Sequence, residues 1–488
     1  EIRKNEYRKL QQFSFANTDR FRTSSLVTRL TGDVTNIQNS ISTGMRPACR
    51  APVMMITAIA VSFYINKELA VIFLIAAPVL GILLFLIISH VRPLYARMQK
   101  AVDLVNRIIQ ENLTAIRVVK SYVRGDYELS KFEEVNAGLQ TTSERAFRVA
   151  SLNMPAMQFV MYTTILCILW FGGNLILAGG MKVGELTGFL SYVLQVLNSL
   201  MMISNVFMMF TRSLTSWKRI TEVMDEKIDI TEDDARDITV EKGDIEFDHV
   251  YFKYSSQAKE YVLSDISLKM EAGQTIGIIG RTGAAKTTLV QLIPRLYDVT
   301  EGQIRIDGYP VQEYPLKPLR DAIAMVLQKN TLFSGTVRDN LRWGKEDATE
   351  EEIEEACRIA CVDEFIGRLE NGYDTDLGQG GVNVSGGQKQ RLCIARALLK
   401  KPKVLILDDS TSAVDTATEA KIREGMAKSL PGTTKIIIAQ RISSVAHADK
   451  IVILEDGKIH ATGTHEELLK NNLIYQEIYQ SQQEGADL

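Results

Sequence analysis

This chain of 488 residues lacks both an excess of basic residues and a set of paired cysteines. Basic residues are not in excess, because the formal net charge is −3, so the overall charge does not suggest a nucleic-acid partner. The cysteines are few and scattered, namely Cys49, Cys167, Cys357, Cys361 and Cys393. Cys357 and Cys361 lie four residues apart with no second pair nearby, so we expect reduced structural thiols rather than a metal site.

Long apolar runs are absent outside residues 51–211, although the whole chain has an ordinary hydrophobic fraction of 46%. A membrane-spanning helix needs about 20 apolar residues. Four runs approach or reach this length: 51–65, 69–89, 154–178 and 186–210. The first is short and would extend back toward Gly44. Because charge-free runs of this kind are unusual in the core of a soluble protein, we predict four membrane spans.

Basic residues are distributed unevenly between the connections of these spans. The short connections 66–68 and 179–185 contain one lysine each, whereas the long segment 90–153 contains ten lysines and arginines. Basic residues stay on the cytoplasmic side of a membrane. We therefore predict that the short connections face outward, and that the long segment and both chain ends face the cytoplasm, in a multi-pass protein of the cytoplasmic membrane.

The long segment itself has almost no glycine or proline after Pro93, and its apolar residues recur at the spacing of an amphipathic helix. We predict two long helices that leave the bilayer, with a turn at Arg124-Gly125-Asp126. This turn either docks on a cytoplasmic partner domain or is a solvated surface of the hairpin.

Residues 213–243 carry mixed charge and an acidic stretch, which predicts a linker. After it, the alternation in Ile245–Phe252 predicts a strand, and Gln274–Ile279 predicts another. The second strand runs directly into a glycine-rich turn and then a helix, the context of a phosphate-binding loop. The predicted fold class is therefore an all-α transmembrane domain, residues 1–212, followed by an α/β P-loop ATPase domain, residues 244–488.

The P-loop residues predict binding of ATP with Mg²⁺. The residues expected to hold the nucleotide are Gly280, Thr282, Gly283, Ala284, Ala285, Lys286, Thr287 and Thr288. Backbone N–H groups and the helix N-terminus attract phosphate oxygens, Lys286 adds a full positive charge, and the Thr287 hydroxyl suits Mg²⁺. The apolar strand Val404–Leu407 then ends in Asp408 and Asp409, and Asp408 suits the outer Mg²⁺ ligand.

Between these two elements lies a short polar run that opens a predicted helix: Ser385, Gly386, Gly387 and Gln388. The order of P-loop, Ser-Gly-Gly-Gln run and aspartate-ended strand closely resembles the ATP-binding cassette (ABC) transporters, specifically the type IV exporters. The resemblance covers nearly the whole chain. It implies that Ser385 to Gln388 are a signature that contacts the γ-phosphate of ATP held by an opposite subunit, with the helix N-terminus facing the anion.

The resemblance assigns roles to further positions. Tyr254 matches the aromatic residue that stacks on adenine, although a tyrosine here could also be a core residue of its strand. Gln328 matches a glutamine that reaches Mg²⁺ and the membrane domain. Residues 412–415 match a loop that crosses the dimer interface. Residues 378–380 resemble a segment that touches the partner's cytoplasmic helices, with Gln379 where glutamate is common.

The membrane half of the resemblance is incomplete. Residues 15–36 look like a first intracellular turn with its rising helix, and residues 112–122 look like a second coupling region. The family has six spans per half, whereas four are counted here. Since the chain has no signal peptide and opens on Glu1 without an initiator methionine, we expect that the first span and most or all of the second are missing from it.

Three positions depart from the family pattern within one site. Ala285 replaces the glycine before the lysine, Asp409 replaces the glutamate that activates water, and Gln440 replaces the switch histidine; all five histidines lie elsewhere. The aspartate carboxylate would sit roughly 1 Å too far back, a displacement that can cost about 100-fold in rate. A glutamine can hydrogen-bond a phosphate oxygen but has no imidazole chemistry.

A shared cause for these departures is a degenerate, ATP-holding site in a heterodimer. The partner would be a non-identical half-transporter that carries the catalytic glutamate and switch histidine, and the intact signature would serve that partner's site. The alternatives are a slow homodimeric exporter and an ATP-binding membrane regulator that moves no substrate. The substrate stays open among hydrophobic or amphipathic drugs, lipids and peptides. Methionines in the last two spans, and Asn198 with Asn205 on one helical face, suit either a substrate path or helix packing.

Overall fold

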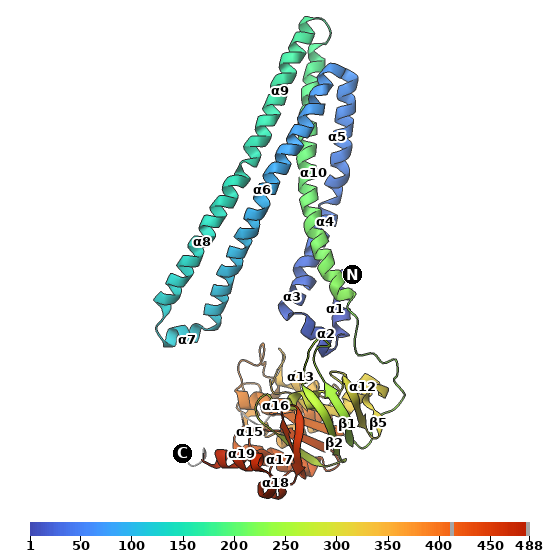
Figure 1. The fold of residues 1–488 in the computed structure, drawn as a ribbon, viewed down its shortest axis with the longest axis vertical. Coiled ribbons are helices and arrows are strands. Elements are labelled where there is room, and N and C mark those ends of the chain that lie inside the picture. The colour runs from blue at the N-terminus through green and yellow to red at the C-terminus, as the bar shows by residue number, and fades with distance from the viewer. Residues whose placement is uncertain (410–413, 485–488) are drawn as a thin grey trace. The chain divides into compact units, whose positions relative to one another are not determined.

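The computed structural model describes residues 1–409 and 414–484, and the chain forms two compact units. The first unit comprises Glu1–Tyr7 and Leu26–Met224, and the second comprises Arg8–Ser25 and the residues from Asp225 onward. In Figure 1 the helical part runs from blue to green and the mixed α/β part from green to red.

The first unit is entirely helical among the residues described. The boundary between the units divides α1 (Ile2–Gln11) and α3 (Thr23–Thr28). The other elements of the first unit are a π-helical turn η1 (Arg29–Asp33), α4 (Val34–Ser42), α5 (Met45–Ile65), α6 (Lys67–Thr114), α7 (Ile116–Ser121), α8 (Gly125–Ser151), α9 (Asn153–Leu177) and α10 (Val183–Met224). Four helical stretches in the described part are long and apolar enough to cross a membrane. They lie within 23–65, 78–114, 125–177 and 183–207, and each overlaps one of the four predicted spans.

Two helices of this unit extend far beyond a bilayer. The 48 residues of α6 span roughly 70 Å, more than twice the ~30 Å hydrocarbon core of a membrane. α6 runs beside α8, and α7 joins the two at their ends, as Figure 1 shows. The predicted pair of long helices is therefore present, and the turn lies at residues 122–124, because Gly125 already begins α8.

The predicted linker begins too early in the chain. Residues 213–224 are the last turns of α10, so their mixed charge belongs to a helix and not to an irregular segment. Ser216, Ile220 and Val223 are almost fully buried and recur at helical spacing. Ser216 donates to the buried Asp33 at 2.8 Å, and Arg219 pairs with the same carboxylate. The charged residues between these positions form the outer face of the helix.

The second unit combines a short helix from the chain's beginning with the predicted α/β domain. Its helices are α2 (Phe15–Arg20), α11 (Lys286–Gln291), α12 (Leu316–Ala322), α13 (Val337–Arg342), α14 (Glu350–Ile359), α15 (Asp363–Ile366), α16 (Gly386–Leu399), α17 (Thr416–Ser429), α18 (His465–Asn471) and α19 (Leu473–Glu484), with 3₁₀ turns η2 (Val311–Glu313), η3 (Gly372–Asp374) and η4 (Ile442–Ser444). Its strands are β1 (Ile245–Phe252), β2 (Leu263–Met270), β3 (Thr275–Ile279), β4 (Glu301–Ile306), β5 (Tyr309–Pro310), β6 (Ile323–Val326), β7 (Val404–Asp408), β8 (Thr434–Ile438), β9 (Lys450–Glu455) and β10 (Lys458–Gly463).

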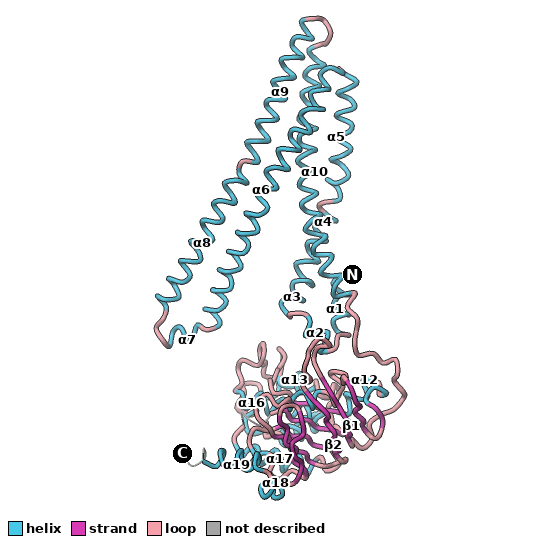
Figure 2. The backbone as a smooth tube through the Cα atoms, viewed as in Figure 1, coloured by secondary structure: helices cyan, strands magenta, loops and turns pink. Residues whose placement is uncertain are grey.

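The strands form two sheets, drawn in magenta in Figure 2. The smaller sheet is antiparallel with the order β2-β1-β4-β5, and the larger has the order β10-β9-β3-β8-β7-β6. In the larger sheet all neighbours are parallel except β9 and β10. Buried apolar side chains fill both faces of β3, β7 and β8, as is usual for parallel strands covered by helices.

This topology brings three separate sequence segments to one edge. β8 lies between β3 and β7, and Ile438 is in register with both Ile278 and Asp408. The carboxyl ends of these parallel strands therefore meet, and the segments that follow them carry the P-loop, the aspartate pair and Gln440. Ligands of open α/β sheets bind at this edge. The predicted fold class, a helical domain followed by an α/β nucleotide-binding domain, is confirmed.

Candidate nucleotide-binding site

The P-loop between β3 and α11 depends on its glycines and contains one strained residue. A side chain at Gly280 would meet the carbonyl oxygen of Leu454 at 2.1 Å, so only glycine fits there. Gly283 has φ of 88°, and Ala285 has φ of 66° and ψ of 24°. An alanine in the left-handed region costs about 1 kcal/mol relative to glycine. Ala285 therefore occupies a position whose backbone geometry suits the glycine expected there.

Lys286, the first residue of α11, turns its ammonium group back over the loop. Its Nζ donates to the carbonyl oxygens of Gly280 and Arg281 at 2.7 and 3.0 Å. Partial burial lowers the pKa of this lysine, and the charges of Asp409 and Asp408 oppose the shift. The charge thus lies at the mouth of a loop of backbone N–H groups, where phosphate oxygens are attracted.

The Thr287 hydroxyl and Asp408 form the second part of the site. Thr287 Oγ1 donates to Asp408 Oδ1 at 3.0 Å, across from α11 to the end of β7. Asp408 is 1% exposed, and among the described residues its Oδ2 has no hydrogen-bond partner. Burial raises the pKa of this carboxyl, because an ionised carboxylate loses its hydration there. A hydroxyl and a buried carboxylate with a spare oxygen are the donor set that Mg²⁺ prefers.

Asp409 is held by two glutamine side chains from neighbouring segments. Gln440 donates its amide to Asp409 Oδ2 at 2.6 Å, and Gln328 approaches the same oxygen at 3.5 Å. The backbone N–H of Asp409 bonds to the carbonyl oxygen of Ile438 at 3.0 Å, which fixes the residue beside β8. Asp409 has φ of 46°. The three residues expected to act next to the γ-phosphate are therefore brought together.

Tyr254, just after β1, is oriented by its hydroxyl and by other rings. Its hydroxyl shares a 2.8 Å hydrogen bond with that of Thr288, which ties the ring to the P-loop helix. The ring makes edge contacts with Phe252 and Tyr297, at centroid distances of 4.9 and 5.2 Å, yet Tyr254 remains 47% exposed. A supported ring with an open surface suits stacking on a flat base.

The signature run begins α16, as predicted. Ser385 is the N-cap, its hydroxyl accepts from the Gln388 N–H at 3.3 Å, and the Gln388 side chain accepts from the Ser385 N–H at 2.8 Å. Ser385 and Gly386 are exposed, whereas Gly387 and Gln388 are half-buried. Among the described residues, no hydrogen bond or ion pair joins this run to the P-loop of the same chain. The helix N-terminus is thus open toward solvent.

The two interface segments expected from the sequence are described only in part. Ser412 and Ala413 lie outside the described residues, Val414 is buried, and Asp415 caps α17 by accepting from the Thr418 N–H at 2.9 Å. Gln379 is exposed in a loop between Gly378 and Gly380, both of which have positive φ.

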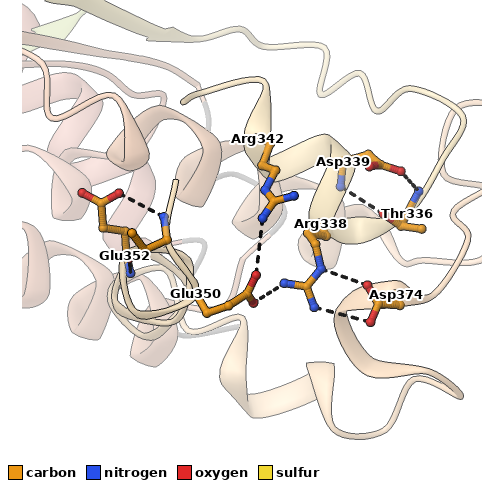
Figure 3. Close-up of polar contacts among 8 residues, drawn as sticks. Thr336, Arg338, Asp339, Arg342, Glu350, Glu352 and Asp374 are labelled. Atoms are coloured by element: carbon orange, nitrogen blue, oxygen red, sulfur yellow. Dashed lines mark hydrogen bonds and ion pairs between the residues drawn. The ribbon is translucent and has the colours of Figure 1, made fainter. Parts of the chain in front are cut away.

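An ion-pair cluster fixes the chain just before Gln379, as Figure 3 shows. Arg338 of α13 donates to both oxygens of Asp374 at 2.9 and 3.4 Å and also pairs with Glu350, which Arg342 approaches at 3.4 Å. The Arg338 guanidinium lowers the pKa of Asp374. A bidentate pair is directional. These ion pairs therefore hold in place the segment around Asp374 that leads into the exposed Gln379 loop.

Two contributors to the site were not expected from the sequence. Tyr297, whose edge touches Tyr254, donates to Asp19 of α2 at 2.7 Å and lies against Phe15. Gln482 of α19 bonds to the backbone on both sides of Arg441. These partners are 278 and 40 residues away in the sequence, so no local pattern could reveal either contact.

Comparisons with known proteins agree with this geometry. A family model of the ABC transporter transmembrane region matches residues 1–200, and the ABC transporter model matches residues 263–412. The uncharacterized ABC transporter ATP-binding protein YfiB of Bacillus subtilis is 42% identical over 489 aligned positions, which cover 100% of this chain and 85% of YfiB. The ATP-dependent lipid A-core flippase of Desulfotalea psychrophila is 35% identical over 461, covering 94% of this chain and 80% of the flippase.

A solved structure shares the fold of the whole chain. A bacterial Atm1-family ABC exporter with ATP bound superposes with a TM-score of 0.84 at 25% identity, over 99% of this chain and 84% of the exporter. The site at the edge of the parallel sheet, the helical spans and these matches lead to one conclusion. The chain belongs to the ABC transporter family, as a multi-pass membrane exporter whose transmembrane domain is followed by a cytoplasmic ATP-binding domain.

Proposed function

We propose that this chain is the ATP-holding half of a heterodimeric exporter that moves a hydrophobic or amphipathic substrate across the cytoplasmic membrane. The observation that carries the proposal is the contact between Asp409 and Gln440, which stand where the family has glutamate and histidine. The partner would be a non-identical half-transporter that carries both of those residues and hydrolyses ATP.

The nucleotide would bind along the P-loop edge. Tyr254 would stack on adenine, the backbone from Gly280 to Ala285 would surround the phosphates, and Lys286 would neutralise them. Thr287 and Asp408 would hold Mg²⁺, and Gln328 would complete its shell. When bound, the cation neutralises phosphate charge and orients the β- and γ-phosphates. The spare buried oxygen of Asp408 supports this assignment.

Hydrolysis at this site would be weak for two reasons. A base must lie within hydrogen-bond reach of the attacking water. Asp409 is one methylene shorter than glutamate, and its Oδ2 already accepts a 2.6 Å hydrogen bond from Gln440. The amide of Gln440 donates but cannot exchange a proton near neutral pH, unlike an imidazole. The same groups can still bind phosphate, so binding without turnover is favoured.

The signature would serve the partner's nucleotide. Ser385 and Gly386 are exposed at the N-terminus of a 14-residue helix, and the two bonds between Ser385 and Gln388 fix the start of that helix. A helix N-terminus of this kind attracts an anion. An intact signature and a degenerate P-loop site in the same chain are the combination expected when a heterodimer holds one ATP at this chain's site and hydrolyses the other at its partner's site.

Residues 1–212 would form the substrate path and residues 244–488 the nucleotide-binding domain. An apolar substrate is supported by the relative named as a lipid A-core flippase and by the mostly apolar spans. Asn198 and Asn205 are exposed on α10, where they would contact substrate or a neighbouring helix.

The test compares ATP turnover by the full-length protein alone, with its partner half, and as the double variant Asp409→Glu, Gln440→His. We expect little turnover alone, robust turnover with the partner, and an increase of about 10- to 100-fold in the isolated double variant, since a correctly placed carboxylate restores the water contact. The control is Asp409→Asn with Gln440→His, which supplies the imidazole without a base.

Robust turnover by the unpartnered wild-type chain would contradict the proposal and favour a slow homodimeric exporter. Uptake of lipid or drug into inside-out vesicles distinguishes the remaining alternative. A partnered complex that hydrolyses ATP but moves none of these substrates would be a regulator rather than an exporter.

A further inference from the structure

The last described helix, α19, presents one face to the core of the nucleotide-binding domain. Tyr475, Ile478, Tyr479 and Gln482 lie three, four and seven residues apart, so they share that face. Tyr475 is fully buried, and the tyrosine and isoleucine at 479 and 478 pack partly buried against the main core cluster. The helix is therefore attached along its length, and the glutamine is the polar end of an otherwise apolar stripe.

The position of α19 is fixed by a second contact near its start. The Tyr475 hydroxyl and the Nδ1 atom of His465 are 2.7 Å apart, and the His465 ring also lies against Tyr479. Buried tyrosines need such a partner for their hydroxyl. This contact joins α18 to α19 and helps to fix the position of Gln482, which lies two helical turns after Tyr475.

Gln482 binds the segment after β8 through both ends of its amide. Its Oε1 accepts from the Ile442 N–H at 2.8 Å, and its Nε2 donates to the Gln440 carbonyl oxygen at 2.7 Å. The two bonds lie on either side of Arg441 and hold the backbone of the segment Gln440–Ile442 in one conformation. The side chain of Gln440, the first residue of this segment, makes the 2.6 Å bond to Asp409.

A continuous connection thus runs from the last helix to the phosphate end of the site. It passes from Gln482 to the backbone of Gln440, and from the Gln440 amide to Asp409, whose neighbour Asp408 bonds to Thr287. Gln440 is exposed, and the backbone on either side of it is also held by the bonds from Ala439 N–H to Ile278 and from Ser444 N–H to Arg441. Glu477 on the same helix lies 3.9 Å from Arg281 in the P-loop, but both are exposed and the pair contributes little.

We propose that Gln482 is a positioning residue that holds the Gln440–Ile442 segment in place, so that recognition of the third phosphate of ATP depends on α19. The inference rests on the proposed ATP-holding site. Gln482 would not touch nucleotide; it would fix the backbone from which the Gln440 amide reaches a γ-phosphate oxygen. ADP has no γ-phosphate, so its binding would be independent of Gln482.

The experiment measures the affinities of the full-length detergent-solubilised protein for ATP and for ADP by calorimetry, with Mg²⁺ present. Gln482→Ala removes both hydrogen bonds, and we expect ATP affinity to fall about 3- to 10-fold, the equivalent of one or two modest hydrogen bonds. ADP affinity stays within about twofold, because the P-loop contacts are unchanged. Gln482→Met, which keeps the length of the side chain, should behave like the alanine variant.

The matched control is Ser481→Ala, which changes the adjacent exposed residue on another face of α19 and should leave both affinities unchanged. Equal losses for ATP and ADP in both Gln482 variants, or no loss in either, would overturn the inference. The ATP and ADP affinities of the wild-type protein distinguish the inference about Gln482 from the ATP-holding proposal. If it does not prefer ATP over ADP, the ATP-holding proposal fails; if it does and Gln482→Ala keeps that preference, only the role of Gln482 fails.

Discussion

The P-loop edge of the domain and the start of α16 face the same chemical task, which is binding phosphate with backbone N–H groups, but they are built differently. At the P-loop edge, Ala285 has a left-handed backbone and Asp409 is bonded to Gln440. At the start of α16, Ser385 and Gln388 form a complete capping box with the exposed Gly386 and the half-buried Gly387 between them. The altered residues would serve this chain's own ATP, and the regular ones would serve a partner's. Under the proposed function, this difference separates ATP binding from ATP hydrolysis between the two sites.

The strongest test of this comparison is Gly386→Glu, at the first position of α16. A carboxylate in the first turn of a helix favours folding, so the variant should be stable. The same charge repels a phosphate at the helix N-terminus, and we expect ATP turnover of the partnered complex to fall by about 100-fold or more. Turnover is measured on the purified complex.

The control for this variant is Val382→Glu, which adds the same charge at an exposed residue outside the helix. Lys286→Ala weakens this chain's own site and should leave most of the turnover intact. If Lys286→Ala stopped turnover as fully as Gly386→Glu, the two regions would be equivalent in hydrolysis and the comparison would be wrong.

Asp408→Asn tests whether the P-loop edge holds Mg²⁺. We expect Mg²⁺ to lose most of its effect on ATP affinity, a loss of about 10- to 100-fold, because a neutral amide is a poor ligand for this cation. Titrations of ATP with and without Mg²⁺ measure the effect. An unchanged response to Mg²⁺ would place the cation on other residues.

The same variant should stabilise the protein without nucleotide. Burial raises the pKa of Asp408, so the native state binds its proton more tightly than the unfolded state, where the pKa is about 3.9. Stability is therefore lost as pH rises from about 4 through the raised native pKa, and this cost persists at neutral pH. Thermal unfolding should show a gain for Asp408→Asn that is larger at pH 7 than near pH 4. The opposite dependence on pH would contradict the conclusion that burial disfavours the ionised form of this carboxyl.

Tyr254→Ala tests the adenine end of the site. Stacking on a base contributes about 1 to 3 kcal/mol, so affinity for ATP and ADP should fall together by roughly tenfold. Tyr254→Phe keeps the ring and loses only the hydroxyl contact with Thr288, so binding should change much less. Equal losses in the two variants would mean that Tyr254 supports the P-loop helix through its hydroxyl and does not stack on the nucleotide.

Whether a feature could be predicted depended on how far apart in the sequence the interacting residues lie. The spans, the P-loop and the signature helix were predictable, because apolar length, glycine at a turn and Ser-x-x-Gln capping are local properties of the chain. The end of α10 was not, since mixed charge at residues 213–224 hides the buried stripe of Ser216, Ile220 and Val223. The contacts of Tyr297 with Asp19 and of Gln482 with Ile442 depend on packing between distant segments.

Ala285→Gly tests the third departure from the family pattern at the P-loop edge, for which we expect the smallest effect. Ala285 has φ of 66°, a conformation that costs an L-residue about 1 to 2 kcal/mol, while glycine loses about 0.4 to 1 kcal/mol through the greater freedom of its unfolded chain. We therefore expect a net gain of about 0.5 kcal/mol in the free energy of unfolding of the nucleotide-binding domain, measured by denaturant titration. Ala284→Gly is the matched control, because Ala284 is buried and lacks a positive φ, so it should destabilise. If both variants destabilise equally, the alanine at 285 is not strained, and the proposed loss of hydrolysis at this edge rests on Asp409 and Gln440 alone.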